Sequence, residues 1–251
     1  MFLDKEEDIM NMISYLKKNE FTLLPHNSFT QKIMNVLREG RMTANNSHDA
    51  LPPDYYSEKE NIMFDVLRIN DTEVRKGYNP QKMRERKIER EVRKNTNGMF
   101  RNDMNYIINS ENPNEHRFEY YINQGVRVIS SHLKNVVIWE REHPTIRDKG
   151  LLICDETSFF AEGKIFINPH TTSEDDIFLR RIDKMHYPWI DENFMKIIYS
   201  SNLSFIVWYM PFRPHAFNHP ITNNYPYIVV MDLRFKKREK LESYNPDLII
   251  R

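Results

Sequence analysis

Four charged residues in the second half of the chain occur in the order of a metal-dependent nuclease site. Asp148 or Asp155 is followed by Glu162 and Lys164. In nucleases of the PD-(D/E)xK type, two carboxylates bind Mg²⁺ and the lysine orients the attacking water. Alternation along a strand predicts that Glu162 and Lys164 lie on the same side. Because 29% of the residues are charged, chance also produces this pattern, and a solvated hairpin is the competing interpretation.

The histidines, serines and the single cysteine do not form a catalytic pattern. His215 and His219 are four residues apart, but Pro214 and Pro220 exclude a regular helix and with it a helical zinc pair. The chain contains no HExxH, no GxSxG and no phosphate-binding glycine pattern. Cys154 lies in an apolar run, which favours an inert core thiol. The leading expectation is therefore a protein that is not an enzyme and that uses no metal and no cofactor.

The basic run Arg75–Arg101 is the candidate nucleic-acid contact. Its centre, Gln81–Lys94, predicts a highly charged helix with a narrow apolar stripe. We expect Arg84, Arg90 and Arg93 on this helix to face DNA. The same helix carries three glutamates, Glu85, Glu89 and Glu91. A solvated helix, or one packed against copies of itself, remains the alternative.

The elements that must position these residues change in type along the chain. Helical spacing predicts helices over Asp4–Lys18, Ser28–Glu39 and Glu58–Ile69, and the polar stretch Arg41–Ser57 predicts a loop or extended arm. Residues 1–112 are therefore predicted to form a helical region with an extended arm.

Aromatic and β-branched residues dominate residues 113–251. Strands are predicted over Leu151–Cys154 and Lys164–Ile167, paired as a hairpin, and over Leu203–Met210 and Tyr227–Leu233. Short helices are predicted over Ser173–Arg181 and Asp191–Tyr199, while Val126–Ile129 and Val136–Trp139 suit either a strand or a buried helix. The fold class is α+β, with a helix-rich first half and a β-containing aromatic second half with long loops.

The composition limits the possible functions. Lys and Arg number 36 and Asp and Glu number 36, which argues against a general nucleic-acid coat or a polybasic membrane binder. Only 6 glycines are present, where average usage gives about 17. The 13 Tyr, 15 Phe and 13 Met suit a protein with large interfaces, although the codon usage of an AT-rich genome also produces them. No apolar run reaches the ~18–20 residues of a membrane span, so we expect no membrane span and synthesis in the cytoplasm.

A proline-rich loop joins the last two predicted strands. It extends from Tyr209 to Tyr227. Its prolines stiffen an extended segment, which lowers the entropy lost on docking. We expect four of its aromatic residues to lie at an intermolecular interface: Phe212, Phe217, Tyr225 and Tyr227. The competing interpretation is that these rings fold back onto the protein's own β core.

In its length and in the order and composition of its segments, the whole chain resembles the lower collar (connector) proteins of small short-tailed, picovirus-like phages of Gram-positive bacteria. The shared features are 251 residues of AT-rich usage, with helices and a charged helix first and an aromatic β region with proline-rich loops after them. The resemblance implies a homo-oligomeric ring below the portal, located in the virion tail. It also implies contacts with portal and tail proteins and a channel that conducts DNA. It assigns no functional residue, and the nuclease and a non-enzymatic nucleic-acid or partner-binding module remain alternatives.

Overall fold

The computed structural model shows a mixed α/β protein built on one large sheet. It describes residues 6–45, 53–71, 117–157, 160–167, 178–211, 225–235 and 240–250. The seven strands of this sheet follow the order β1-β9-β8-β5-β4-β3-β2. Their bounds are β1 Phe21–Leu24, β2 Thr43–Ala44, β3 Tyr55–Ser57, β4 Ile62–Ile69, β5 Asp148–Asp155, β8 Phe205–Tyr209 and β9 Ile228–Asp232. Among the described residues, no helix is long and apolar enough to cross a membrane.

Three neighbouring strands at the centre of the sheet, β4, β5 and β8, run parallel. β9 is antiparallel to β8, and β1 is parallel to β9. β3 and β2 extend the other side of the sheet as antiparallel strands. Strands from the first 71 residues thus share a sheet with strands from the second half, and the predicted division into a helix-rich first half and a β-containing second half is not confirmed.

The predicted helix over Glu58–Ile69 is wrong, because Ile62–Ile69 form the strand β4. Successive side chains of β4 point to opposite faces of the sheet, and both faces are buried. Ile62 and Phe64 belong to one core, while Met63 and Leu67 belong to the other. A strand buried on both faces is a continuous apolar run, and its periodicity does not distinguish it from a buried helix.

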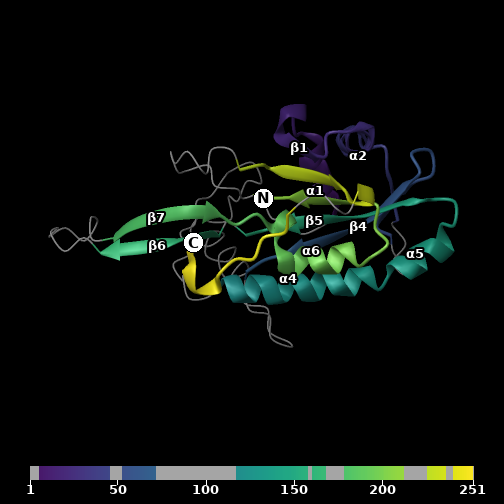
Figure 1. Ribbon diagram of the computed structural model, residues 1–251. Helices are drawn as coiled ribbons and strands as arrows, with labels where there is room; N and C mark the ends of the chain where they lie inside the picture. Colours follow the sequence, from purple (N-terminus) through teal and green to yellow (C-terminus); the bar gives the residue numbers. More distant parts are fainter. Residues whose placement is uncertain are drawn as a thin grey trace, which may run out of the picture.

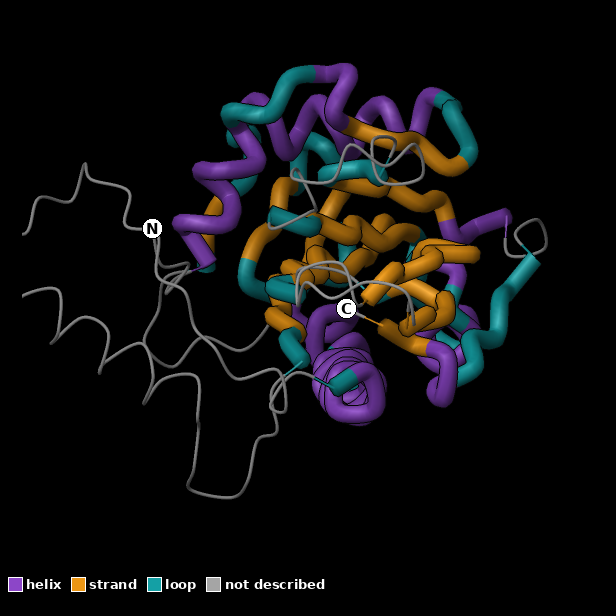
Figure 2. Tube along the Cα trace, turned by 90° about the vertical axis from the view of Figure 1, so that its left-hand side faces the viewer, coloured by secondary structure: helices purple, strands orange, loops and turns teal. Residues whose placement is uncertain are grey.

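Helices cover both faces of the sheet, as Figures 1 and 2 show. α1 Glu6–Ser14 and α2 Ser28–Glu39 lie on one face, and α4 Phe118–Leu133, α5 Val136–Glu142 and α6 Glu192–Tyr199 lie on the other. The predicted helices over Ser28–Glu39 and Asp191–Tyr199 are confirmed. The helix predicted over Asp4–Lys18 is confirmed over Glu6–Ser14 and ends four residues earlier than predicted. Val126–Ile129 and Val136–Trp139 lie in helices.

The boundaries of α2 follow from its sequence. The Asn27 side chain accepts hydrogen bonds from the backbone N–H of Phe29 at 3.0 Å and of Thr30 at 2.9 Å. These bonds satisfy donors that the first helical turn leaves free. Gly40 ends the helix with a φ of 61°, a left-handed conformation that glycine adopts without steric cost.

A second, three-stranded sheet has the order β10-β6-β7. β6 Ala161–Ile167 and β7 Phe178–Met185 form an antiparallel ribbon that projects from the body in Figure 1, and β10 Ile249–Ile250 pairs with the base of β6. The predicted strands over Leu151–Cys154 and Lys164–Ile167 are confirmed, but their pairing as a hairpin is wrong. β5 pairs with β4 and β8 instead, because strand partners are chosen by tertiary packing and not by proximity in sequence.

The structure also describes all or part of several other segments for which an element was predicted. The helix predicted over Ser173–Arg181 is wrong in its described part, since residues 178–181 belong to β7. The predicted arm Arg41–Ser57 contains β2 and β3 in its described parts. The strands predicted over Leu203–Met210 and Tyr227–Leu233 are confirmed as β8 and β9.

Candidate functional site

The parallel strands β4, β5 and β8 end along one edge of the sheet, here called the carboxyl edge. In open sheets of this type, ligands bind beyond the carboxyl ends of the parallel strands. β4 ends at Ile69, β5 at Asp155 and β8 at Tyr209. α4 and α6, which run back to β5 and β8, begin at the same edge. A functional site is therefore expected at this edge.

Asp155 is the central polar residue of the carboxyl edge. Its side chain is 1% exposed and accepts four hydrogen bonds. The Tyr121 hydroxyl and the Trp208 indole N–H donate to Oδ2 at 2.7 and 2.9 Å. The backbone N–H and hydroxyl of Thr157 donate to Oδ1 at 3.1 and 2.7 Å. Burial raises the pKa of Asp155, and these hydrogen bonds oppose that rise. Both oxygens are engaged within the chain, so this carboxylate ties α4, β5 and β8 together.

A buried histidine–aspartate pair lies at the same edge. Nε2 of His186 is 2.7 Å from Oδ2 of Asp191, and the two residues are 2% and 0% exposed. The rings of Phe118, Tyr121 and Tyr244 stand edge-on to the imidazole, with centroids 5.0, 5.7 and 4.6 Å away. These aromatic rings exclude water and substrate from the pair. In this arrangement, the pair fixes the turn between β7 and α6.

Asp191 has a second role at the start of α6. Its Oδ1 accepts a hydrogen bond from the backbone N–H of Asn193 at 2.8 Å. A capping residue was predictable from the sequence, since Asp191 precedes an apolar helical pattern. The pairing with His186 was not recognised, although the two residues are only five apart. The Tyr121–Asp155–Trp208 network joins three distant segments and leaves no local sequence signal.

Asp148 and Asp155, the alternative carboxylates of the predicted nuclease site, lie at opposite ends of β5. Seven residues of strand separate them by about 23 Å, at roughly 3.3 Å per residue. Glu162 and Lys164 lie on β6, in the other sheet. The register shift opposite Glu162 and Gly163 leaves the extra residue, Asp183, on β7. Within the described ranges, no group of three or more His, Cys, Asp or Glu side chains could hold a metal ion.

Five predicted contact residues lie outside the described residues: Arg84, Arg90, Arg93, Phe212 and Phe217. His215 and His219, the histidines considered as a zinc pair, lie outside them too. The charged helix predicted over Gln81–Lys94 lies outside them as well. The described residues that flank these segments are placed at the carboxyl edge. Asp71 follows β4 and Arg117 precedes α4, while Met210 N–H donates to the Tyr227 carbonyl at 2.8 Å. Both segments predicted to make contacts therefore connect to the body at this edge.

Tyr225, which was predicted to lie at an intermolecular interface, is buried within its own chain. The residue is 4% exposed, and its hydroxyl donates to the carbonyl oxygen of His186 at 2.9 Å. Its ring stacks on Tyr187 with centroids 5.5 Å apart. The competing interpretation, in which the aromatic folds back onto its own β core, holds for this residue. Tyr227 is partly buried.

Acidic residues gather around His132, on α4 next to β3 and β4. Nδ1 of His132 is 3.0 Å from Oδ2 of the buried Asp65. Asp54 accepts a hydrogen bond from Val66 N–H at 2.7 Å, and burial together with the Asp65 charge raises the pKa of Asp54 to about 7. Burial lowers the pKa of His132. The hydrogen bond and the charge of Asp65 raise this pKa by a larger amount, so the net shift is upward. Burial also raises the pKa of Glu6.

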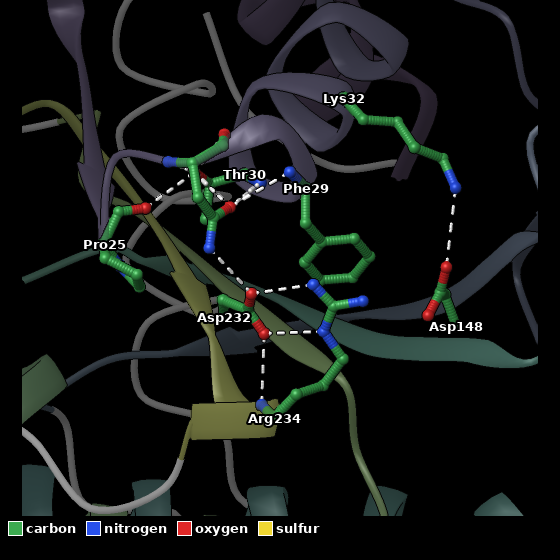
Figure 3. Close-up of polar contacts among 8 residues, drawn as sticks. Pro25, Phe29, Thr30, Lys32, Asp148, Asp232 and Arg234 are labelled. Atoms are coloured by element: carbon green, nitrogen blue, oxygen red, sulfur yellow. Dashed lines mark hydrogen bonds and ion pairs between the residues drawn. The ribbon is translucent and has the colours of Figure 1, made fainter.

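The opposite edge of the sheet carries a polar network around Asp232 (Figure 3). Asn27 Nδ2 donates to Oδ2 of Asp232 at 3.0 Å, and Arg234 binds both oxygens through Nε and Nη2 at 2.9 and 2.8 Å. The guanidinium carbon of Arg234 lies 3.6 Å from the centroid of the Phe29 ring. Burial would raise the pKa of Asp232, but the hydrogen bonds from Arg234 and Asn27 hold it below its usual value. The network joins the start of α2 to the end of β9. Lys32, also on α2, pairs with Asp148 at 3.4 Å.

A groove of about 540 Å³ lies between α1, α2 and β2. Met10, Leu37 and Tyr55 supply apolar walls, and Glu7 and Arg38 supply charge. This mixture specifies no ligand chemistry.

Comparison with protein-family models, with curated proteins and with solved structures finds no match for this chain.

Proposed function

We propose that the protein is a non-enzymatic assembly component, a lower-collar type subunit of a phage tail that forms a homo-oligomeric ring and binds portal and tail proteins. In this proposal, the carboxyl edge is the contact region, and DNA passes through the channel of the ring. One observation carries the proposal. The charged groups of this edge are engaged inside the chain, while the two segments predicted to contact partners connect to the body there.

The engaged groups argue against chemistry at this edge. Asp155 uses both carboxylate oxygens in internal hydrogen bonds, and His186 and Asp191 are paired under aromatic rings. Arg68 on β4 donates from Nε to Glu156 at 2.7 Å. A catalytic or metal-binding carboxylate would instead need an oxygen that substrate or metal can reach.

The outer strand of the smaller sheet favours association. β7 is an outer strand of the three-stranded sheet and has eight residues. A long outer strand presents backbone donors and acceptors to which another chain can add a strand. The net charge of zero gives little electrostatic repulsion between copies.

Native mass spectrometry of the full chain at micromolar concentration tests the proposal. We expect one closed oligomer, whose assembly is lost in the Phe212→Ser/Phe217→Ser double variant while thermal stability is unchanged. Tyr15→Ser is the matched control, because Tyr15 is an aromatic residue that is 87% exposed and directly follows α1. A chain that stays strictly monomeric, both alone and with tail or portal proteins added, would overturn the proposal.

DNA contact is a separate part of the proposal and has its own test. If Arg84, Arg90 and Arg93 bind phosphates, affinity for duplex DNA should fall steeply with salt, because each contact releases counterions. Replacing the three arginines by Gln should flatten that dependence. Binding that does not change between low and moderate salt would remove DNA from the proposal and leave the assembly role intact.

A further inference from the structure

The segment Lys240–Ile250, here called the strap, crosses the carboxyl edge over the start of α6. In Figure 1 it runs past α6 to the base of the β6–β7 ribbon. Glu242 N–H donates to the carbonyl of Ile190, and Glu192 N–H donates to the carbonyl of Glu242, both at 2.9 Å. The strap ends in β10, which adds an antiparallel strand to β6 with Ile249 opposite Glu162.

One buried side chain anchors the strap. Among Lys240–Ile249, Tyr244 alone is buried, at 5% exposed. Its hydroxyl accepts a hydrogen bond from Tyr187 N–H at 3.0 Å, and its ring packs edge-on against His186. Lys184 lies 4.4 Å from the centre of the Tyr244 ring and forms an ion pair with Glu242.

This arrangement has the form of a peptide-binding site that the chain fills with its own segment. An aromatic anchor enters a pocket, an acidic residue two positions earlier meets a lysine, and a short strand is added to a sheet. Peptide recognition by strand addition combines backbone hydrogen bonds with pockets for a few side chains in the same way. The receiving surface consists of the start of β6, at Ala161 and Glu162, and of residues 184–192.

We propose that the strap is exchanged between copies, so that the strap of one copy occupies the Tyr244 pocket of a second copy. A segment held by one buried side chain and a few backbone bonds opens at a lower free-energy cost than the core. A second copy offers an identical strap, so exchange reproduces every contact at little cost. When each copy gives its strap to the next, the contacts are head-to-tail, which is the arrangement that closes rings. This inference rests on the proposed self-assembly and names the element that mediates it.

Disulfide trapping separates binding within one chain from binding between chains. One full-length variant carries Glu162→Cys and another carries Ile249→Cys, at positions that face each other across β6 and β10. The native Cys154 stays in both, since it is buried and burial raises the pKa of its thiol. We expect a disulfide-linked heterodimer when the two variants are mixed, assembled and oxidised. Neither variant by itself should give a disulfide-linked dimer.

Two matched controls define a specific cross-link. Ser131→Cys mixed with Lys196→Cys reports random collisions, because both positions are exposed and outside the strap contacts. Adding Tyr244→Ala to the Ile249→Cys chain should reduce the heterodimer to the level of that control. If the chain with Tyr244→Ala does not fold, Glu242→Lys takes its place in the Ile249→Cys chain. The yield of heterodimer should then fall, and Lys184→Glu in the Glu162→Cys chain should restore it.

The outcomes distinguish this inference from the proposed function. Oligomers without heterodimer, together with an intramolecular disulfide when both cysteines are in one chain, would overturn strap exchange and leave self-assembly standing. A monomer without any cross-link between chains would overturn both. A heterodimer that survives Tyr244→Ala at full yield would show a different interface and would also overturn the exchange.

Discussion

Replacing Asp155 by Ala tests whether this residue is a structural centre or a functional carboxylate. The substitution removes the acceptor of four hydrogen bonds and leaves three buried groups without their partner: the Tyr121 hydroxyl, the Trp208 indole N–H and Thr157. Each buried donor that loses its partner costs about 1–3 kcal/mol. With at least three such groups, we expect Asp155→Ala to lower the free energy of unfolding by at least about 3 kcal/mol, a large part of the ~5–15 kcal/mol of an ordinary domain.

Tyr121→Phe is the matched variant, because it removes one of the four hydrogen bonds and keeps the ring. A hydrogen bond to a charged group contributes about 1.5–3 kcal/mol, so this variant should lie between wild type and Asp155→Ala. Urea unfolding followed by tryptophan fluorescence is a suitable assay, since Trp208 is buried and bonded to the network. An Asp155→Ala protein as stable as wild type would refute the structural role. Loss of a Mg²⁺-dependent DNA cleavage in that stable variant would further support the nuclease alternative.

Substitutions at three other positions have expected outcomes that follow from local geometry. The raised pKa of Asp54 means that the folded state holds its proton up to about pH 7 while the unfolded chain releases it near pH 4, so stability should fall between about pH 4 and pH 7. Asp54→Asn should flatten that decline in urea titrations, and an unchanged slope would place the pH dependence elsewhere. Asn27→Ala removes the N-cap of α2 and should cost about 1–2 kcal/mol by thermal unfolding, whereas Asn27→Ser, which retains a capping oxygen and adds no charge beside Asp232, should cost less. Gly150→Ala would place a methyl group 2.3 Å from the Phe205 ring, so we expect a loss of roughly 1–3 kcal/mol in chemical denaturation; an unaffected midpoint would mean that the ring moves aside freely.

Local signals in the sequence predicted the elements that are amphipathic or clearly capped. α2 has apolar residues at helical spacing, an Asn before its first turn and a Gly after its last, and it was predicted to the residue. β8 and β9 are short apolar runs bounded by prolines and polar residues, and they were also recognised. The single cysteine was expected to be an inert core thiol, and Cys154 is fully buried in β5.

The strand β4 shows where local signals fail. Its residues fill two cores on opposite faces of the sheet, so every position is apolar or internally paired and the period of 2 disappears from the sequence. The partner of β5 could not be predicted either. A hairpin with the next strand is the local choice, and the parallel pairing with β4 and β8 results from packing of segments about 50 to 90 residues apart.

The candidate sites depended still more on tertiary structure. The sequence by itself determined residue chemistry: which carboxylates, histidines and basic residues exist, that charge is balanced and that no catalytic signature is present. Only the tertiary structure decided that Asp148 and Asp155 lie at opposite ends of one strand and that Asp155 is surrounded by donors from α4 and β8. It also decided that Tyr244 is the anchor of a strap. Hydrogen bonds and burial depend on distances between segments far apart in the chain, and a single sequence contains spacing only along the chain.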